Sequence, residues 1–194
     1  MSETSHKQRT RQRILEEAAA IMRVVGTEGI GVAALMKRVG LTHGGFYAHF
    51  SSRDDLVAHV VDQMFSDAAQ SLQGLSAAGS AAERLRMLID LYLSDVARTG
   101  PQASCPLPSL AGEAGRLPEA ARERFALGIQ ALEGLLAREI AGLGLADPER
   151  QARSVQAEMI GAMALARAIP DDVRAAERLA DSRLALRQRL GIAD

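Results

Sequence analysis

The sequence of 194 residues predicts an all-α fold of about nine helices, because helical periodicity recurs along the chain and no strand pattern interrupts it. Only 3% of the residues are aromatic, so most of the core must be built from Leu, Ala, Ile, Val and Met, which suits helix packing. Glycine and proline punctuate the helical segments. We expect an N-terminal domain over residues 1–52 and a larger helical body over residues 53–194.

Charge is distributed unevenly along the chain. Residues 1–53 carry eight Lys/Arg against four Glu, a net charge of +4, whereas residues 54–194 carry fifteen Arg against twenty Asp/Glu, a net charge of −5. A basic domain on an acidic body is typical of a nucleic-acid-binding domain joined to a domain with another role. Solvated helix faces also carry such charges, so this interpretation needs a motif beside it.

A helix-turn-helix is predicted between residues 32 and 50. Apolar residues at helical spacing give the first helix one buried face. Gly40 follows this helix and can take the positive φ that ends a helix without steric cost. Thr42 stands at the N-cap of a second helix, where its hydroxyl can accept a backbone N–H.

The second helix, over about residues 42–48, has an unusual composition. Its adjacent glycines, Gly44 and Gly45, each cost about 1 kcal/mol relative to Ala, so its backbone is expected to lie close to another surface. Tyr47 and His49 add hydrogen-bonding groups. We interpret the unit as a helix-turn-helix whose second helix enters the DNA major groove.

Four short motifs carry a family resemblance: Gly40-Leu41-Thr42, Gly45-Phe46-Tyr47, His49-Phe50 and Ser52-Arg53-Asp54-Asp55-Leu56. Together they resemble the DNA-binding domain of the TetR/AcrR family of bacterial transcription regulators. The resemblance covers residues 10–65, and beyond them it is one of helical layout. Arg53 stands where the family usually has Lys, and Met36 stands where such units usually have Ala, which predicts a slightly wider separation of the two helices.

The resemblance implies a set of DNA contacts. The expected DNA-binding residues are Thr42, His43, Gly44 and Gly45, which face the bases or lie close to the DNA backbone, and Tyr47, His49 and Arg53, which hold phosphates.

The body is expected to contain six helices. They are predicted over residues 53–72, 80–98, 109–114, 118–142, 147–168 and 171–190. Small and apolar residues form a stripe on each of the last two helices: Ala157, Ile160, Gly161, Ala164 and Leu165 on one, and Ala175, Leu179, Ser182, Leu186 and Leu190 on the other. In the family these two helices form a four-helix bundle with a second subunit, which implies a homodimer; alternatively, both stripes pack on their own body.

The function that the resemblance implies is DNA-binding transcription regulation. The expected mechanism is repression from a palindromic operator, relieved when a small-molecule effector enters a cavity lined by residues 53–142. No signal peptide is recognised in the polar and basic start of the chain, and the apolar run at residues 159–166 is too short to span a bilayer. We therefore expect a cytoplasmic protein with no membrane partner.

No catalytic signature is found, so neither an enzyme nor a cofactor is expected. The four His residues have no Cys or carboxylate at metal-ligand spacing, which predicts no metal site. Cys105 lies in a proline-rich loop, and TetR-like regulators with Cys-Pro there include sensors of electrophiles or oxidants. Cys105 is thus a candidate sensor, and the alternative is a buried structural thiol. Two other classes stay open: a carrier protein with a vestigial helix-turn-helix, and an enzyme with Cys105 as nucleophile.

Overall fold

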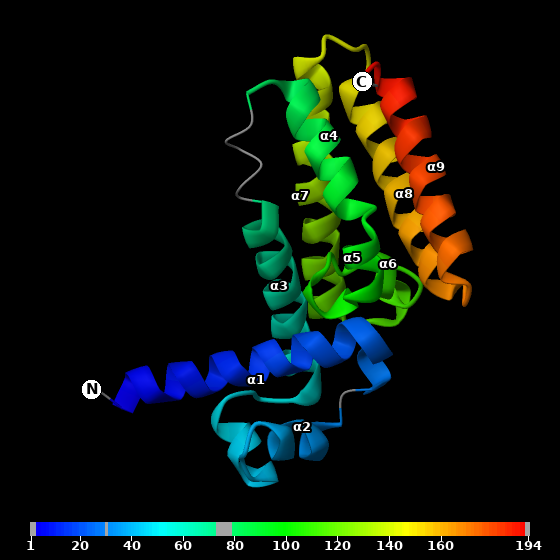
Figure 1. Ribbon diagram of the computed structural model, residues 1–194. Helices are drawn as coiled ribbons and strands as arrows, with labels where there is room; N and C mark the ends of the chain where they lie inside the picture. Colours follow the sequence, from blue (N-terminus) through cyan, green and yellow to red (C-terminus); the bar gives the residue numbers. More distant parts are fainter. Residues whose placement is uncertain (1–2, 30, 73–78, 193–194) are drawn as a thin grey trace.

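The computed structural model describes residues 3–29, 31–72 and 79–192. These residues form nine α-helices and no strand, so the all-α prediction is confirmed (Figure 1). The helices are α1 (Glu3–Val25), α2 (Val32–Arg38), α3 (Arg53–Leu72), α4 (Ala81–Tyr92), α5 (Asp95–Thr99), α6 (Leu107–Leu110), α7 (Glu119–Gly142), α8 (Pro148–Ala168) and α9 (Asp172–Leu190). Short 3₁₀ segments connect them: η1 (Thr27–Gly29), η2 (His43–Ala48), η4 (Pro101–Ala103) and η5 (Ala114–Arg116).

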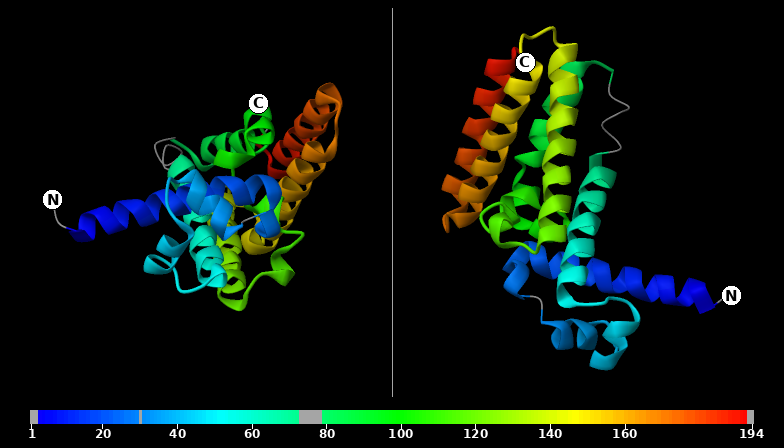
Figure 2. Two further views of the ribbon diagram at one scale, coloured as in Figure 1. Left: turned by 90° about the horizontal axis from the view of Figure 1, so that it is seen from below. Right: turned by 180° about the vertical axis from the view of Figure 1, so that it is seen from behind.

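The molecule has a small head and an elongated body. The head consists of α1, α2 and η2, and α1 projects beyond the other head elements at its N-terminal end (Figure 1). Helix α3 leaves the head and rises into the body beside α7. Helices α8 and α9 run side by side along one edge of the body, as seen from the front and from behind (Figure 2).

The core of the head is built from apolar side chains of α1, α2, η2 and α3. Met36 is fully buried there. Its methyl carbon Cε lies 3.8 Å from the position that a Cβ on Gly45 would occupy. A side chain on Gly45 would thus begin in ordinary van der Waals contact with Met36, and Met36 does not require glycine at this position.

Several helix ends follow the predicted capping chemistry. The Thr42 hydroxyl accepts the backbone N–H of Gly45 at the start of η2. Ser80 and Glu83 form a complete capping box at α4. Gly40 has φ of 74°, as a helix-ending glycine should.

Other element boundaries differ from the prediction. Helix α1 runs from Glu3 to Val25, and Val25 at its C-terminal end is exposed. The helix predicted over residues 80–98 is two helices, because the Ser94 hydroxyl accepts the N–H of Ala97 and caps a new one. The helix predicted at residues 109–114 begins earlier in the sequence, as α6. The second helix predicted in the head is the 3₁₀ segment η2.

The two stripes of small and apolar residues have different surroundings. On α9, Ala175, Leu179, Leu186 and Leu190 are all buried inside this chain, so most of that stripe forms core. The stripe on α8 is instead partly or largely accessible, and Leu165 is 55% exposed. Of the two alternatives left open by the sequence, packing on the same body therefore holds for the buried residues of α9.

Buried polar contacts join the head to the body. Arg23 of α1 is buried, and its Nη2 donates to the carbonyl oxygen of Met64 at 2.9 Å and to the carboxylate of Asp67 at 3.0 Å. The carboxylate of Glu113 accepts both the backbone N–H of Thr27 at 3.1 Å and its hydroxyl at 2.6 Å. Both contacts end on the C-terminal part of α1 and the turn that follows it, which fixes the head against the body.

The packing of α7 on α3 generates a stability prediction. A Cβ on the buried Gly128 would lie 2.2 Å from the ring of Phe65, which itself packs edge-on against Phe125 at a centroid distance of 5.7 Å. Gly134, on the same helix, is exposed with open space around it. Gly134→Ala is expected to stabilise the protein by up to about 1 kcal/mol through helix propensity. Gly128→Ala should destabilise it by about 1–3 kcal/mol through overpacking.

Chemical denaturation of the two variants and the wild type measures both effects. Equal stabilisation by the two alanines would contradict the close approach of α7 to Phe65.

Candidate functional site

The segment η2 presents a polar surface on a buried aromatic anchor. Phe46 and Phe50 are buried, and their rings stack at a centroid distance of 5.5 Å. The residues between and before them point outward: Thr42, His43 and Gly44 are exposed, and Tyr47 is 66% exposed. The anchor thus holds four of the predicted DNA-contact residues at the surface of the head.

Neither the backbone conformation of Gly44 nor the packing around it requires glycine at this position. Its φ is not in the left-handed region, and a Cβ built on it would meet no atom of the protein within 4 Å. The absence of a side chain therefore serves neither turn geometry nor packing. It leaves backbone groups open to close approach from outside, which is what contact with a base edge or a phosphate requires.

The ring of Tyr47 is supported from two sides. It meets the ring of Phe46 edge-on at a centroid distance of 5.3 Å and that of His43 at 6.3 Å. Since most of the side chain is exposed, its phenolic group is presented to solvent in a restricted orientation. A positioned neutral donor of this kind suits hydrogen bonding to a phosphate oxygen.

His49 and Arg53 lie near this surface. His49 is partly buried, and Arg53 has hydrogen-bond and ionic partners within the protein. Burial, together with the positive charges of Lys7 and Arg11, lowers the pKa of His49 below its ordinary value, so its imidazole is neutral at pH 7. Arg53 donates from Nη2 to the carbonyl oxygen of Thr27 at 2.6 Å, and it lies 3.7 Å from Glu28. Their roles as phosphate contacts stay predictions.

The N-terminal half of α1 also approaches this surface. The guanidinium of Arg11 lies over the ring of Phe50, 4.9 Å from its centroid. Arg11 and Lys7 also lower the pKa of His49, which places their charges beside the end of η2. The sequence shows a run of basic residues before residue 14, but their position relative to η2 depends on how α1 packs.

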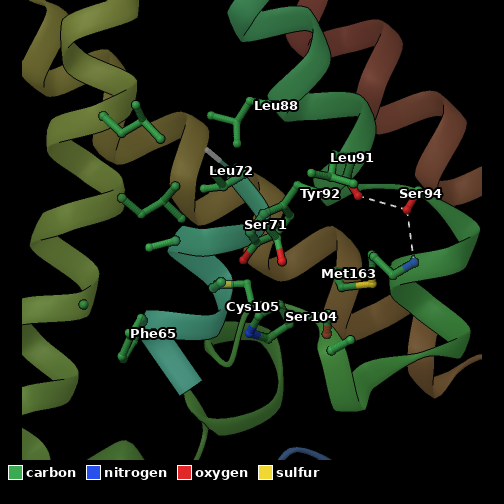
Figure 3. Close-up of a pocket in the computed structure, with 18 of the residues that line it drawn as sticks. Phe65, Ser71, Leu72, Leu88, Leu91, Tyr92, Ser94, Ser104, Cys105 and Met163 are labelled. Carbon is green, nitrogen blue, oxygen red and sulfur yellow. Dashed lines mark hydrogen bonds between the residues drawn. The ribbon is translucent and has the colours of Figure 1, made fainter. Parts of the chain in front are cut away.

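The body contains a cavity of about 660 Å³ between α3, α4, α7 and α8 and the segment from Ser94 to Pro108 (Figure 3). Its wall is mostly apolar, with Phe65, Leu72, Leu88 and Met163 among the lining residues. A volume of this size lies within the range of small-molecule sites. The sequence predicted wall residues between 53 and 142, and it missed the contribution of α8.

Cys105 lies in the wall of this cavity, next to Tyr92 (Figure 3). Burial raises the pKa of the Cys105 thiol, an effect larger than the opposing effects of the Leu107 backbone, the nearby Tyr92 hydroxyl and the charges of Arg23 and Arg167. A reactive sensor thiol needs the opposite shift. The raised pKa therefore favours the structural reading of Cys105, whereas its partial accessibility leaves the sensor role as an untested alternative.

Two arginines on the cavity wall have contrasting surroundings. Arg84 pairs with the buried carboxylate of Glu139 at 2.8 Å. Arg167 donates only to neutral acceptors: the carbonyl oxygen of Ala97 at 2.8 Å and the hydroxyls of Ser104 at 2.7 Å and Ser109 at 2.9 Å. The charge of Arg84 is thus balanced by an ion pair, whereas, among the described residues, that of Arg167 is not.

The described residues contain neither a cluster of metal-ligating side chains nor a helix that could cross a membrane. Over residues 3–29, 31–72 and 79–192, no three His, Cys, Asp or Glu side chains are grouped as a metal site would need. Within those ranges, no helix has both the length and the apolar character needed to cross a bilayer.

Comparison with known proteins identifies the head. Residues 14–60 match the family model described as bacterial regulatory proteins, tetR family. Two uncharacterized HTH-type transcriptional regulators from two strains of Mycobacterium tuberculosis are each 29% identical over 117 residues. That match covers 60% of this chain and 58% of each relative.

Solved structures share the fold of the whole chain. The reduced form of NemR from E. coli has a TM-score of 0.81 at 21% identity, with 92% of this chain and 95% of that chain covered. A TetR-family transcriptional regulator from Agrobacterium tumefaciens has a TM-score of 0.82 at 22% identity, covering 94% and 98%. Residues 14–60 thus resemble the DNA-binding part of the TetR family of bacterial regulatory proteins, and the chain shares its overall fold with solved regulators of that family.

Proposed function

We propose that this protein is a homodimeric repressor, acting in the cytoplasm, that binds a palindromic operator and leaves it when a small-molecule effector enters the cavity of the body. The observation that carries the DNA-binding part is the exposed, glycine-containing η2 held on a buried aromatic anchor within the matched domain. The large apolar cavity supports the effector part. Resemblance to a family of regulators favours this reading over the carrier and enzyme alternatives.

In this proposal η2 enters the major groove. Thr42 and His43 contact base edges, and the bare backbone at Gly44 and Gly45 approaches the DNA closely. The hydroxyl of Tyr47 donates to a phosphate. Because the Thr42 oxygen accepts the N–H of Gly45 with one lone pair, its hydroxyl hydrogen and its second lone pair are left to offer to the DNA.

Dimerisation is proposed through the outer faces of α8 and α9. Three large apolar side chains are exposed there: Leu165 at 55%, Val173 at 68% and Leu184 at 53%. The exposed residues around them include the small side chains Ala157 and Ala180, which permit close helix approach. A two-fold axis beside these helices would place two heads on the two halves of a palindrome.

Two routes could carry a change in the cavity to the head. One is α3, which contributes Phe65 and Leu72 to the cavity wall and continues into the head core. The other is the segment from Ser104 to Glu113, which lines the cavity at one end and binds Thr27 at the other. Ligand binding that favours a different position of either element would alter the head orientation and so the fit to DNA.

The first prediction tests the close approach at Gly44. Gly44→Leu is expected to fold like the wild type, because the new side chain meets no protein atom at its base. It should weaken binding to duplexes selected by the wild type from a random pool by about tenfold or more, since steric exclusion of one contact readily costs 1.4 kcal/mol. Gly134→Leu, at an equally open glycine of the body, is the matched control and should bind normally. Wild-type affinity of Gly44→Leu in a gel shift would refute the interface.

The second prediction concerns Tyr47. Tyr47→Phe keeps the ring contacts and removes only the hydroxyl, so it should weaken DNA binding by about 0.5–1.5 kcal/mol. The loss should be similar for all DNA sequences, because phosphate contacts carry no sequence information. The slope of affinity against salt should not change, since no charge is removed. A loss confined to particular base substitutions in the operator would assign Tyr47 to base reading instead.

The third prediction tests the dimer. Wild-type protein should sediment as a dimer at micromolar concentration, and Leu165→Glu combined with Leu184→Glu should give folded monomers, because buried unpaired charge opposes association. Leu127→Glu is the control: Leu127 is 64% exposed on α7 and should tolerate the charge in a dimer. Leu186→Glu should instead unfold the chain, since Leu186 is fully buried within one subunit. A monomeric wild type would remove the palindromic model as well.

A further inference from the structure

Arg167 is a half-buried cation without a negative partner. In the part of the chain that the structure describes, its guanidinium binds a carbonyl oxygen and two serine hydroxyls, and no carboxylate lies within ion-pair distance. Its Nε is buried and has no hydrogen-bond partner there. Burial lowers the pKa of Arg167 below its ordinary value, which reports how poorly the charge is solvated.

The groups nearest to Arg167 do not neutralise it. Burial raises the pKa of the Tyr92 hydroxyl well above its ordinary value, and it also raises the pKa of the Cys105 thiol. Both groups are therefore neutral at pH 7. The Tyr92 hydroxyl is itself buried beside the weakly accepting thiol, without a well-formed hydrogen bond. A cation and an under-used donor thus share one region of the wall.

The other cations of the cavity are different. Arg84 is neutralised by Glu139. Arg138 also lines the cavity, but it is exposed and can be hydrated without a ligand. Only at Arg167 would an incoming negative charge both balance a poorly solvated cation and accept unused N–H groups.

We infer that the effector cavity takes an amphiphilic organic anion, with a carboxylate or similar acidic group at Arg167 and an apolar body between α3, α4 and α8. This inference rests on the proposed function, because it assumes that the cavity binds the effector. Arg–carboxylate pairs are strong and directional, so they suit recognition of one acidic group. The Tyr92 hydroxyl supplies a second donor at the same place.

The remaining wall fits the apolar part of such a ligand. Phe65, Leu72, Leu88, Leu91 and Met163 border one continuous space next to Tyr92 and Cys105 (Figure 3). These side chains offer no charge of their own. The cavity therefore combines one acidic-group site with a larger apolar surface.

The test uses two fluorescent probes with the same aromatic body. The anion 1-anilinonaphthalene-8-sulfonate carries a negative group, and N-phenyl-1-naphthylamine does not. With wild-type protein the anion should bind about tenfold tighter or more, an energy typical of a charge-assisted hydrogen bond. Octanoate should displace the neutral probe at a concentration about tenfold lower than octanamide does, for the same reason.

Three variants locate the effect. Arg167→Gln should abolish the preference for the anion and leave the affinity for the neutral probe within about twofold, since only the charged contact is lost. Arg138→Gln, at the other unpaired cation of the wall, should behave as wild type. Arg167→Lys keeps the charge and should retain part of the preference, which preserves the test if the glutamine variant does not fold.

The outcomes separate this inference from the proposed function. Binding of both probes without preference in the wild type, or a preference that survives in Arg167→Gln, overturns the assignment of Arg167. If neither probe binds to the wild type, the result counts against an effector cavity, and thus against the proposed mechanism of release. Loss of anion preference in Arg138→Gln alone would move the acidic-group site to Arg138 and likewise overturn the inference.

Discussion

The helix α3 is the element on which both parts of the molecule depend. Its twenty residues span about 30 Å. Leu56, Val57 and Val60 are buried near its N-terminal end, where the chain leaves the head, and Phe65 packs against α7 further along. Because one rigid rod belongs to both cores, the head cannot turn relative to the body unless α3 turns with it or its packing on α1 breaks. The buried Arg23, bonded to the Met64 carbonyl, opposes such a break.

Local chemistry made much of the fold predictable. Gly40 and the Ser80–Glu83 capping box act on groups within a few residues, so sequence alone locates the helix ends that they make. The break before Ser94 was missed because the apolar periodicity continues through it, up to the buried Leu93 and into the helix that Ser94 caps. The stripe on α9 shows a different limit. Periodicity says that Leu179 and Leu186 face something, but it does not say whether that surface belongs to the same chain.

The two candidate sites also differ in how far local sequence predicts them. The exposure of Thr42, His43 and Tyr47 follows from a short motif whose anchor residues lie within the same segment. By contrast, the contact of Arg53 with Thr27 spans 26 positions, and that of Arg167 with Ser104 spans 63. Long-range contacts of charged side chains depend on the packing of whole helices, which no local pattern encodes. The sequence therefore located the exposed surface of η2 but not the cation in the cavity.

The placement of the two tyrosines has a spectroscopic consequence. The chain has no Trp, so its intrinsic near-ultraviolet emission comes from Tyr47 and Tyr92 alone. Tyr47 lies on the exposed surface of the head, and Tyr92 lies in the wall of the cavity. Each proposed site thus contains one of the two tyrosines. In the Tyr47→Phe variant, the remaining tyrosine emission would come entirely from the cavity wall. It would report occupancy of the cavity without an attached label.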